Sequence, residues 1–226
     1  MSSTERTPRL LGAAFLGVVL TSLTSGVLFM SATGEGSVSQ VLAHVADNAA
    51  LARLSIVAGM ANSVGIVVLA AFLYVVLARH SKVLALIALA CWLGEAMFYA
   101  LQQIGVSGLI PLGQDFVKAG SPDSSYFQTF GDLLYNGLYK FGGTILMFFY
   151  CAGGLAWYGL FYRSRLIPRA IPAFGLVAVS VGLVGTVLGL LGNDVPMLAY
   201  LPILPFELTI GTWLLLRGTR HDPAAS

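Results

Sequence analysis

Six apolar stretches, each long enough to cross a lipid bilayer as a helix, restrict the fold of this chain more than any other feature. A hydrocarbon core of about 30 Å needs about 20 predominantly apolar residues per helix. The stretches cover residues 10–30, 51–77, 83–104, 127–162, 170–191 and 197–217. Only 10% of the 226 residues are charged, against roughly 25% in a soluble domain. The sequence therefore predicts an all-α fold, a polytopic transmembrane helical bundle of six spans that forms one integral-membrane domain over residues 1–226.

The connections between the spans are polar and differ in kind. Residues 31–48 carry apolar side chains at helical spacing, which predicts a short helix lying in the membrane interface. Residues 105–126 are rich in Gly, Pro, Ser and Asp and are predicted to be a loop. The first apolar stretch resembles the core of a signal peptide, but about 25 uncharged residues exceed the roughly 7–15 of such a core. We therefore expect an uncleaved first span.

The distribution of Lys and Arg predicts the orientation, because cytoplasmic loops carry an excess of these residues. With both termini in the cytoplasm, nine of the twelve cations fall on the inner side: Arg6, Arg9, Arg79, Lys82, Arg163, Arg165, Arg169, Arg217 and Arg220. The outer connections keep only Arg53 and Lys118. The pattern predicts a multi-pass protein of the cell (inner) membrane with membrane lipids as partners. A net charge of +2 is too small to indicate nucleic acid, and the oligomeric state is left open.

Two of the predicted spans carry a glutamate near the middle. Glu95 and Glu207 each lie about ten residues from the outer end of their helix, which is about 15 Å deep at 1.5 Å per residue. A carboxylate at the bilayer centre costs a few kcal/mol, so it usually faces a partner, a cavity or a functional site. Lys140 of the fourth span lies at a similar depth. Two carboxylates against one ammonium do not cancel, so we expect one carboxyl group to be protonated or to share its proton.

Further polar and aromatic side chains extend this candidate site toward the outer face. Tyr99 and Gln102 follow Glu95 on one helical stripe, and a second stripe on the fourth span runs from Asp132 to Lys140. Together they predict the walls of a cavity that opens outward. Pro202 and Pro205 predict an irregular start to the last helix, just before Glu207. The full prediction has Glu95 and Glu207 as the catalytic groups and, as binding residues, Asn62, Trp92, Tyr99, Gln102, Tyr135, Asn136, Tyr139 and Lys140.

Three functions are compatible with this constellation. The first is binding or translocation of a small solute or a proton that enters from the outer side. The second is an intramembrane enzyme that acts on a lipid or isoprenoid through a protonated glutamate as general acid. The third is a structural or partner protein whose polar groups hold helices together, worth about 0.6–2 kcal/mol per contact. The sequence does not decide whether the protein is an enzyme.

Motifs for metals and cofactors are absent from the sequence. No HExxH, GxSxG or phosphate-binding loop occurs. The three histidines, His44, His80 and His221, lie outside the predicted spans, which excludes haem ligation by paired transmembrane histidines. Cys91 and Cys151 fall within apolar runs and are expected to be buried thiols. We predict no metal and no cofactor.

Four separated motifs resemble one known family. They are DFVKAGSPDSSYFQTFG (115–131), SRLIPR (164–169), GEA (94–96) and LPILPFELTIGTWLLLRG (201–218). Taken in chain order, they resemble the bacterial membrane family catalogued as domain of unknown function 4386. The resemblance implies a membrane protein of six to seven helices without an established activity. An Arg often precedes the third-helix glutamate by three residues in that family, whereas Trp92 occupies this position here.

Overall fold

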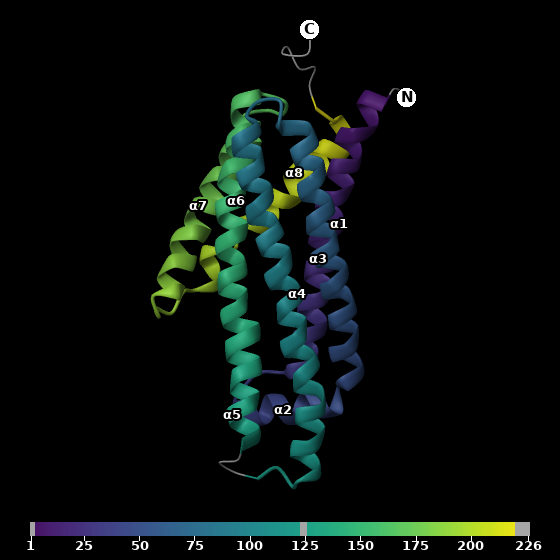
Figure 1. Cartoon of the computed structure of the whole chain (residues 1–226), viewed down its shortest axis with the longest axis vertical. Coiled ribbons are helices and arrows are strands. Elements are labelled where there is room, and N and C mark those ends of the chain that lie inside the picture. The colour runs from purple at the N-terminus through teal and green to yellow at the C-terminus, as the bar shows by residue number, and fades with distance from the viewer. Residues whose placement is uncertain (1–2, 123–125, 220–226) are drawn as a thin grey trace. The chain divides into compact units, whose positions relative to one another are not determined.

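The chain is almost entirely helical (Figure 1). The computed structural model describes residues 3–122 and 126–219. Within these residues six helical segments are long and apolar enough to cross a membrane, which confirms the predicted fold class. The elements are α1 (Ser3–Thr33), α2 (Val38–Asp47), α3 (Ala49–Leu77), α4 (Lys82–Lys118), α5 (Tyr126–Asp132), α6 (Gly142–Ser164), α7 (Ala170–Leu190) and α8 (Ile203–Arg217). A π-helical segment, η1 (Leu133–Phe141), joins α5 to α6, and a 3-10 turn, η2 (Met197–Ala199), precedes α8.

The short helix predicted between the first two spans is present as α2. Ser37 caps its N-terminus by accepting a hydrogen bond from the backbone N–H of Gln40, and the Gln40 side chain accepts one from the backbone N–H of Ser37. This reciprocal arrangement satisfies two donors that a helix start otherwise leaves unpaired. Val41, Leu42 and Val45 are buried, so one face of α2 packs against its neighbours.

The loop predicted for residues 105–126 is wrong over most of its length, because α4 continues without interruption to Lys118. Pro111 lies inside the helix. The prediction failed because it weighed local composition, whereas helix packing favours the small residues in this part of α4. A Cβ added at Gly105 would lie 3.1 Å from the carbonyl oxygen of Leu134, and one at Gly113 would overlap the carbonyl oxygen of Leu42. The glycines allow close approach of other backbones rather than a turn.

The described chain divides into two compact units, and the long helices α1, α3 and α4 each contribute residues to both units. Unit 1 contains the residues up to Val19, Val64–Ala96 and the residues from Thr144 onward; unit 2 contains Leu20–Ser63 and Met97–Gly143. The predicted single domain and the predicted cytoplasmic side of the termini stay predictions. Of the residues used to predict the orientation, Arg220 lies outside the described part of the chain, as does His221 of the polar tail.

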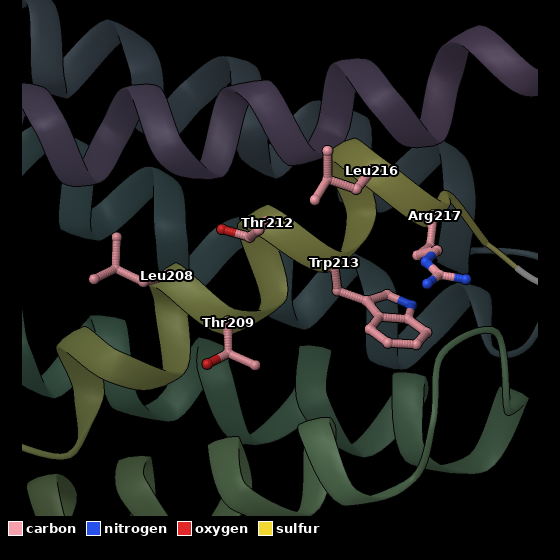
Figure 2. A pocket seen from close by; sticks show the side chains of 6 residues that line it. All are labelled: Leu208, Thr209, Thr212, Trp213, Leu216 and Arg217. Atoms are coloured by element: carbon pink, nitrogen blue, oxygen red, sulfur yellow. The ribbon is translucent and has the colours of Figure 1, made fainter.

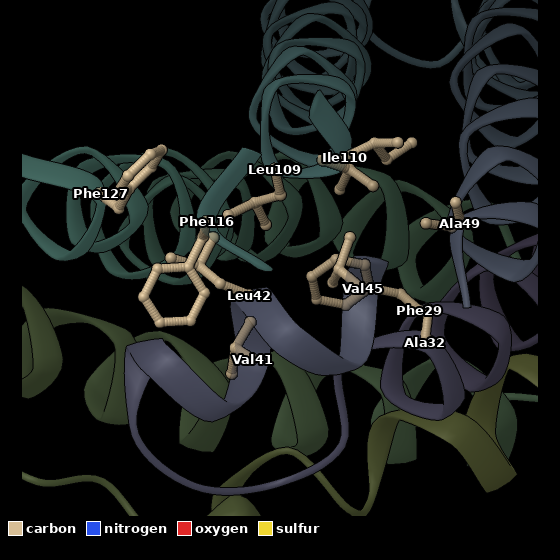
Figure 3. Close-up of a cluster of buried hydrophobic side chains, with 12 residues drawn as sticks. Phe29, Ala32, Val41, Leu42, Val45, Ala49, Leu109, Ile110, Phe116 and Phe127 are labelled. Atoms are coloured by element: carbon tan, nitrogen blue, oxygen red, sulfur yellow. The ribbon is translucent and has the colours of Figure 1, made fainter. Parts of the chain in front are cut away.

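A cluster of buried apolar side chains forms the core of unit 2 (Figure 3). It joins α2 to the C-terminal end of α1, the start of α3, the second half of α4 and α5. Its buried members are Phe29, Ala32, Val41, Leu42, Val45, Ala49, Ala52, Val106, Leu109, Ile110, Phe116 and Phe127. Phe116 and Phe127 meet edge to face with ring centres 5.8 Å apart. The extension of α4 beyond residue 104 is therefore stabilised by burial of its apolar face against α2 and α5.

Candidate functional site

Glu207 accepts a hydrogen bond from a tyrosine within unit 1. It is the fifth residue of α8 and is half-buried. The hydroxyl of Tyr150 on α6 donates to Glu207 Oε1 at 2.9 Å. The Tyr158 hydroxyl, on the same helix, lies 3.5 Å from that of Tyr150. The carboxyl group and the two phenols thus form a short chain of polar groups among apolar side chains.

Glu95 is the second carboxyl group of this cluster. It lies on α4 and is 6% exposed, and its Oε2 is buried without a hydrogen-bond partner. Glu207 is close enough to interact electrostatically with it. A buried carboxylate without a counter-charge is strongly disfavoured. This pair of acidic groups therefore requires a proton or a cation.

The depth of both carboxyl groups follows from their helices. Glu95 lies 13 residues after Lys82, about 20 Å along α4, and Glu207 lies ten residues before Arg217, about 15 Å along α8. Both distances are measured from helix ends with a basic residue, and the hydrocarbon core is about 30 Å thick. Both side chains thus lie well away from the basic ends of their helices, within the apolar segments that are long enough to cross a membrane.

Aromatic rings pack against Tyr150 and Tyr158, the two phenols of this cluster. Trp92, one turn before Glu95, stacks on Tyr150 with ring centres 5.9 Å apart, and its indole N–H donates to the Tyr150 carbonyl oxygen at 3.2 Å. Trp157 meets Trp92 edge to face at 6.2 Å. Tyr158 and Phe206 meet in the same way at 4.5 Å. These rings hold Tyr150 and Tyr158 in fixed positions beside the carboxyl groups.

Two glycines allow this close packing. A Cβ at Gly153 would overlap Cδ1 of Trp92, and a Cβ at Gly175 on α7 would overlap Cζ of Phe206. Trp92 is 2% exposed and Phe206 is 0% exposed. The indole nitrogen of Trp157 is also buried and lacks a hydrogen-bond partner. The packing around Trp92 and Phe206 therefore leaves no room for an added methyl group at Gly153 or Gly175.

Four of the predicted site residues lie together in unit 2. The Gln102 side-chain amide donates to the carbonyl oxygen of Tyr139 in η1 at 2.6 Å. Tyr139 stacks on Tyr135 with ring centres 6.5 Å apart. The Lys140 ammonium lies 4.3 Å from the centre of the Tyr135 ring. A π-helix of nine residues is unusual, and π-helical turns occur frequently at functional sites. That Lys140 meets the glutamates stays a prediction.

Asn62 and Asn136, two further predicted site residues of unit 2, have hydrogen-bond partners. Asn62 is 1% exposed and accepts a hydrogen bond from the Thr21 hydroxyl at 2.9 Å, which links α3 to α1. Asn136 donates to Asp132 Oδ1 at 2.6 Å, one turn earlier. Tyr99 is partly buried on α4. The Asn62 contact is of the kind that holds transmembrane helices together.

The irregular start predicted for the last span precedes α8. Residues 197–202 contain only the turn η2, and Pro202 is the N-cap of α8. Pro205 lies in the first helical turn, where a missing N–H removes no intrahelical hydrogen bond. The helix that carries Glu207 is therefore regular but short, with 15 residues.

Tyr150 and Tyr158 are the members of this cluster that the sequence prediction missed. Both lie within an apolar span, where a buried phenol needs a hydrogen-bond partner. The prediction concentrated on the tyrosines near the start of the same span. Tyr150 lies 13 residues before Arg163, about 20 Å along α6 and comparable to the glutamates, and this position is the signal that could have identified it.

No group of three or more His, Cys, Asp or Glu side chains that could hold a metal ion occurs within residues 3–122 and 126–219. Cys91 and Cys151 are free thiols. The cluster in unit 1 therefore offers two carboxyl groups, Glu95 and Glu207, and two phenols, Tyr150 and Tyr158.

The six helical segments of the described residues that are long and apolar enough to cross a membrane define a polytopic helical membrane protein. The comparison with family models agrees with this class. The model described as "Domain of unknown function (DUF4386)" matches residues 10–218. The chain belongs to this family. No curated protein and no solved structure matches the chain.

Proposed function

We propose that the protein binds and translocates protons across the membrane, alone or together with a small solute, through the carboxyl pair Glu95 and Glu207. The observation that carries this proposal is the buried Glu95 Oε2, which has no hydrogen-bond partner and lies near a second acidic side chain. A proton shared by the pair removes the like-charge repulsion. Release of that proton requires access to water or to an entering cation.

The packing around the pair favours a proton over a larger ligand. Trp92, Tyr158 and Phe206 are buried and held by ring contacts on several sides. A proton is the cation that reaches Glu95 without displacing these rings. The same packing argues against a lipid substrate beside the carboxyl groups, because an acyl or isoprenoid chain would have to move several of them.

The hydroxyl groups of Tyr150 and Tyr158 support the same function. A proton on Glu207 lies next to an O–H that both donates and accepts. Tyr158 lies next to Tyr150 and interacts electrostatically with Glu95. We infer that a proton passes between Glu207 and Glu95 along these two phenols. Glu207 is the more accessible of the two carboxyl groups and is the entry point.

A purely structural role in helix association would explain the hydrogen bond of Glu207 but not the buried carboxyl group of Glu95. The bond from Tyr150 to Glu207 is a typical polar contact between spans. Glu95 Oε2 makes no such contact, so a purely structural role would leave a buried polar atom unsatisfied at about 1–3 kcal/mol. An amide in place of this carboxyl group would serve a structural role equally well.

The test is proton flux into liposomes that contain the purified protein and a trapped pH-sensitive dye. We expect Glu95→Gln and Glu207→Gln each to abolish flux driven by a potassium diffusion potential. Glu35→Gln, which changes an exposed residue between α1 and α2 in the same way, is the matched control and should retain flux. Undiminished flux in either of the first two variants would refute the proposal. Failure of either variant to insert or fold would show instead that the carboxyl group is structural.

A further inference from the structure

A pocket on α8 lies on the side of the helix opposite to its buried face (Figure 2). Phe206, Ile210 and Leu214 of α8 are fully buried in unit 1. The pocket has a volume of about 460 Å³ and is lined by Leu208, Thr209, Thr212, Trp213, Leu216 and Arg217, none of which is among the buried residues of α8. Because α8 belongs to a membrane span, this side meets lipid rather than water.

The chemistry of the pocket changes along the helix axis. Leu208, which is 43% exposed, lies at the deep end, and Arg217 is the last residue of α8. The Arg217 guanidinium lies 6.0 Å from the centre of the Trp213 ring. The Thr209 hydroxyl donates to the Pro205 carbonyl oxygen at 2.7 Å, so its own polar group is satisfied by the helix. The end of the pocket at Leu208 is thus apolar, and the end at Arg217 is basic.

The length of the pocket matches one leaflet of a bilayer. Nine residues separate Leu208 from Arg217, which is about 14 Å at 1.5 Å per residue. Half of a hydrocarbon core of about 30 Å is about 15 Å. Trp213 lies near the end of the helix, where indole rings favour the boundary between headgroups and acyl chains. A lipid in this leaflet would have its phosphate at Arg217 and an acyl chain along Leu216 and Leu208.

Charge favours an anionic lipid. The lining residues include a cation and no acidic side chain. Because one span separates α6 from α8, their C-terminal ends reach the same membrane face, but Arg163 near the end of α6 does not line the pocket. Basic residues at a membrane surface attract anionic headgroups. We propose that this pocket binds an anionic phospholipid of the leaflet in which α8 ends, with its phosphate on Arg217.

The intrinsic fluorescence of the chain supplies a direct assay. The chain has three tryptophans; Trp92 and Trp157 are 2% and 0% exposed, whereas Trp213 lines the pocket. In liposomes whose lipids carry brominated acyl chains, contact with a lipid quenches the fluorescence of Trp213 before that of the two buried tryptophans. We expect brominated phosphatidylglycerol to quench the protein more strongly than brominated phosphatidylethanolamine at the same mole fraction, and Trp213→Phe to remove the difference.

Two arginine variants separate the pocket from general surface charge. Arg217→Gln should lower the relative affinity for phosphatidylglycerol about fivefold, which corresponds to about 1 kcal/mol. Arg163→Gln, the same change outside the pocket, should leave quenching unaltered. An equal loss in both variants would overturn the proposal, as would equal quenching of the wild type by the two lipids. Quenching by neither lipid would mean that a protein surface, such as a second copy of this chain, covers the pocket.

Discussion

Replacing Gly153 by alanine tests the packing that holds the candidate proton site. The added methyl group would overlap Cδ1 of Trp92 and would lie 2.8 Å from its Nε1 and 3.0 Å from Cβ of Cys91. Trp92 cannot easily give way, since it stacks on Tyr150 and meets Phe15 and Trp157 edge to face. We therefore expect either the indole ring or the backbone of α6 to shift.

Three contributions set the expected change in the free energy of unfolding of Gly153→Ala. Overpacking of a filled core costs about 1–3 kcal/mol. A displaced indole also loses its hydrogen bond to the Tyr150 carbonyl oxygen, worth about 1 kcal/mol. Alanine in place of glycine within a helix returns about 0.5–1 kcal/mol. We expect the free energy of unfolding to fall by about 2 kcal/mol.

Gly159→Ala is the matched control on the same helix. A Cβ at Gly159 would meet no atom within 4 Å. This variant should unfold with an unchanged free energy or with a gain of up to about 1 kcal/mol. The assay is reversible unfolding in mixed micelles with rising dodecyl sulfate, followed by tryptophan fluorescence. Equal stability of the two variants would show that α6 and Trp92 do not approach each other as closely as in the structure.

Three further predictions concern individual hydrogen bonds. In a double-mutant cycle, Tyr150→Phe and Glu207→Gln should show a coupling of about 1 kcal/mol in the free energy of unfolding, because each removes a partner of the same bond; additive effects would contradict the bond. Thr21→Val should destabilise the protein by about 1 kcal/mol in the same assay, since Asn62 loses its donor; this loss should disappear when Asn62 is already leucine. Ser37→Ala should cost about 1 kcal/mol and raise hydrogen exchange at the first amides of α2; unchanged exchange there would show that the cap does not hold this helix.

The six spans are predictable from the sequence because apolar length is a local property. Each predicted stretch corresponds to a helical segment, and Ser37 with Gln40 explains why α2 forms where apolar spacing indicates it. The extension of α4 to Lys118 is different, because it depends on backbones that approach from α2 and η1. Gly113 and Pro111 are turn signals when considered alone. Only the surrounding contacts show that they belong to a helix.

Part of the candidate site is predictable because it depends on a local property of the sequence. A charge within an apolar run is visible locally, so Glu95 and Glu207 stand out. Their partner is not visible in this way, because Tyr150 is one of several tyrosines in a long span. The carbonyl oxygen of Tyr139 that binds Gln102 belongs to a π-helical turn, and no sequence pattern used here indicates such a turn. The position of a charge along an apolar run is read directly from the sequence, whereas side-chain pairing depends on how the helices are rotated.

The shortness of α8 makes the protein sensitive to bilayer thickness. Its 15 residues extend about 22 Å, less than a hydrocarbon core of about 30 Å. Such hydrophobic mismatch is relieved by local thinning of the bilayer, at fractions of a kcal/mol per ångström. Glu207 is only four residues from the start of α8, so thinning on this side brings water closer to its carboxyl group. In the proposed proton pathway, lipid chain length would therefore control access to the carboxyl pair, and bilayers of short-chain lipids should favour proton entry.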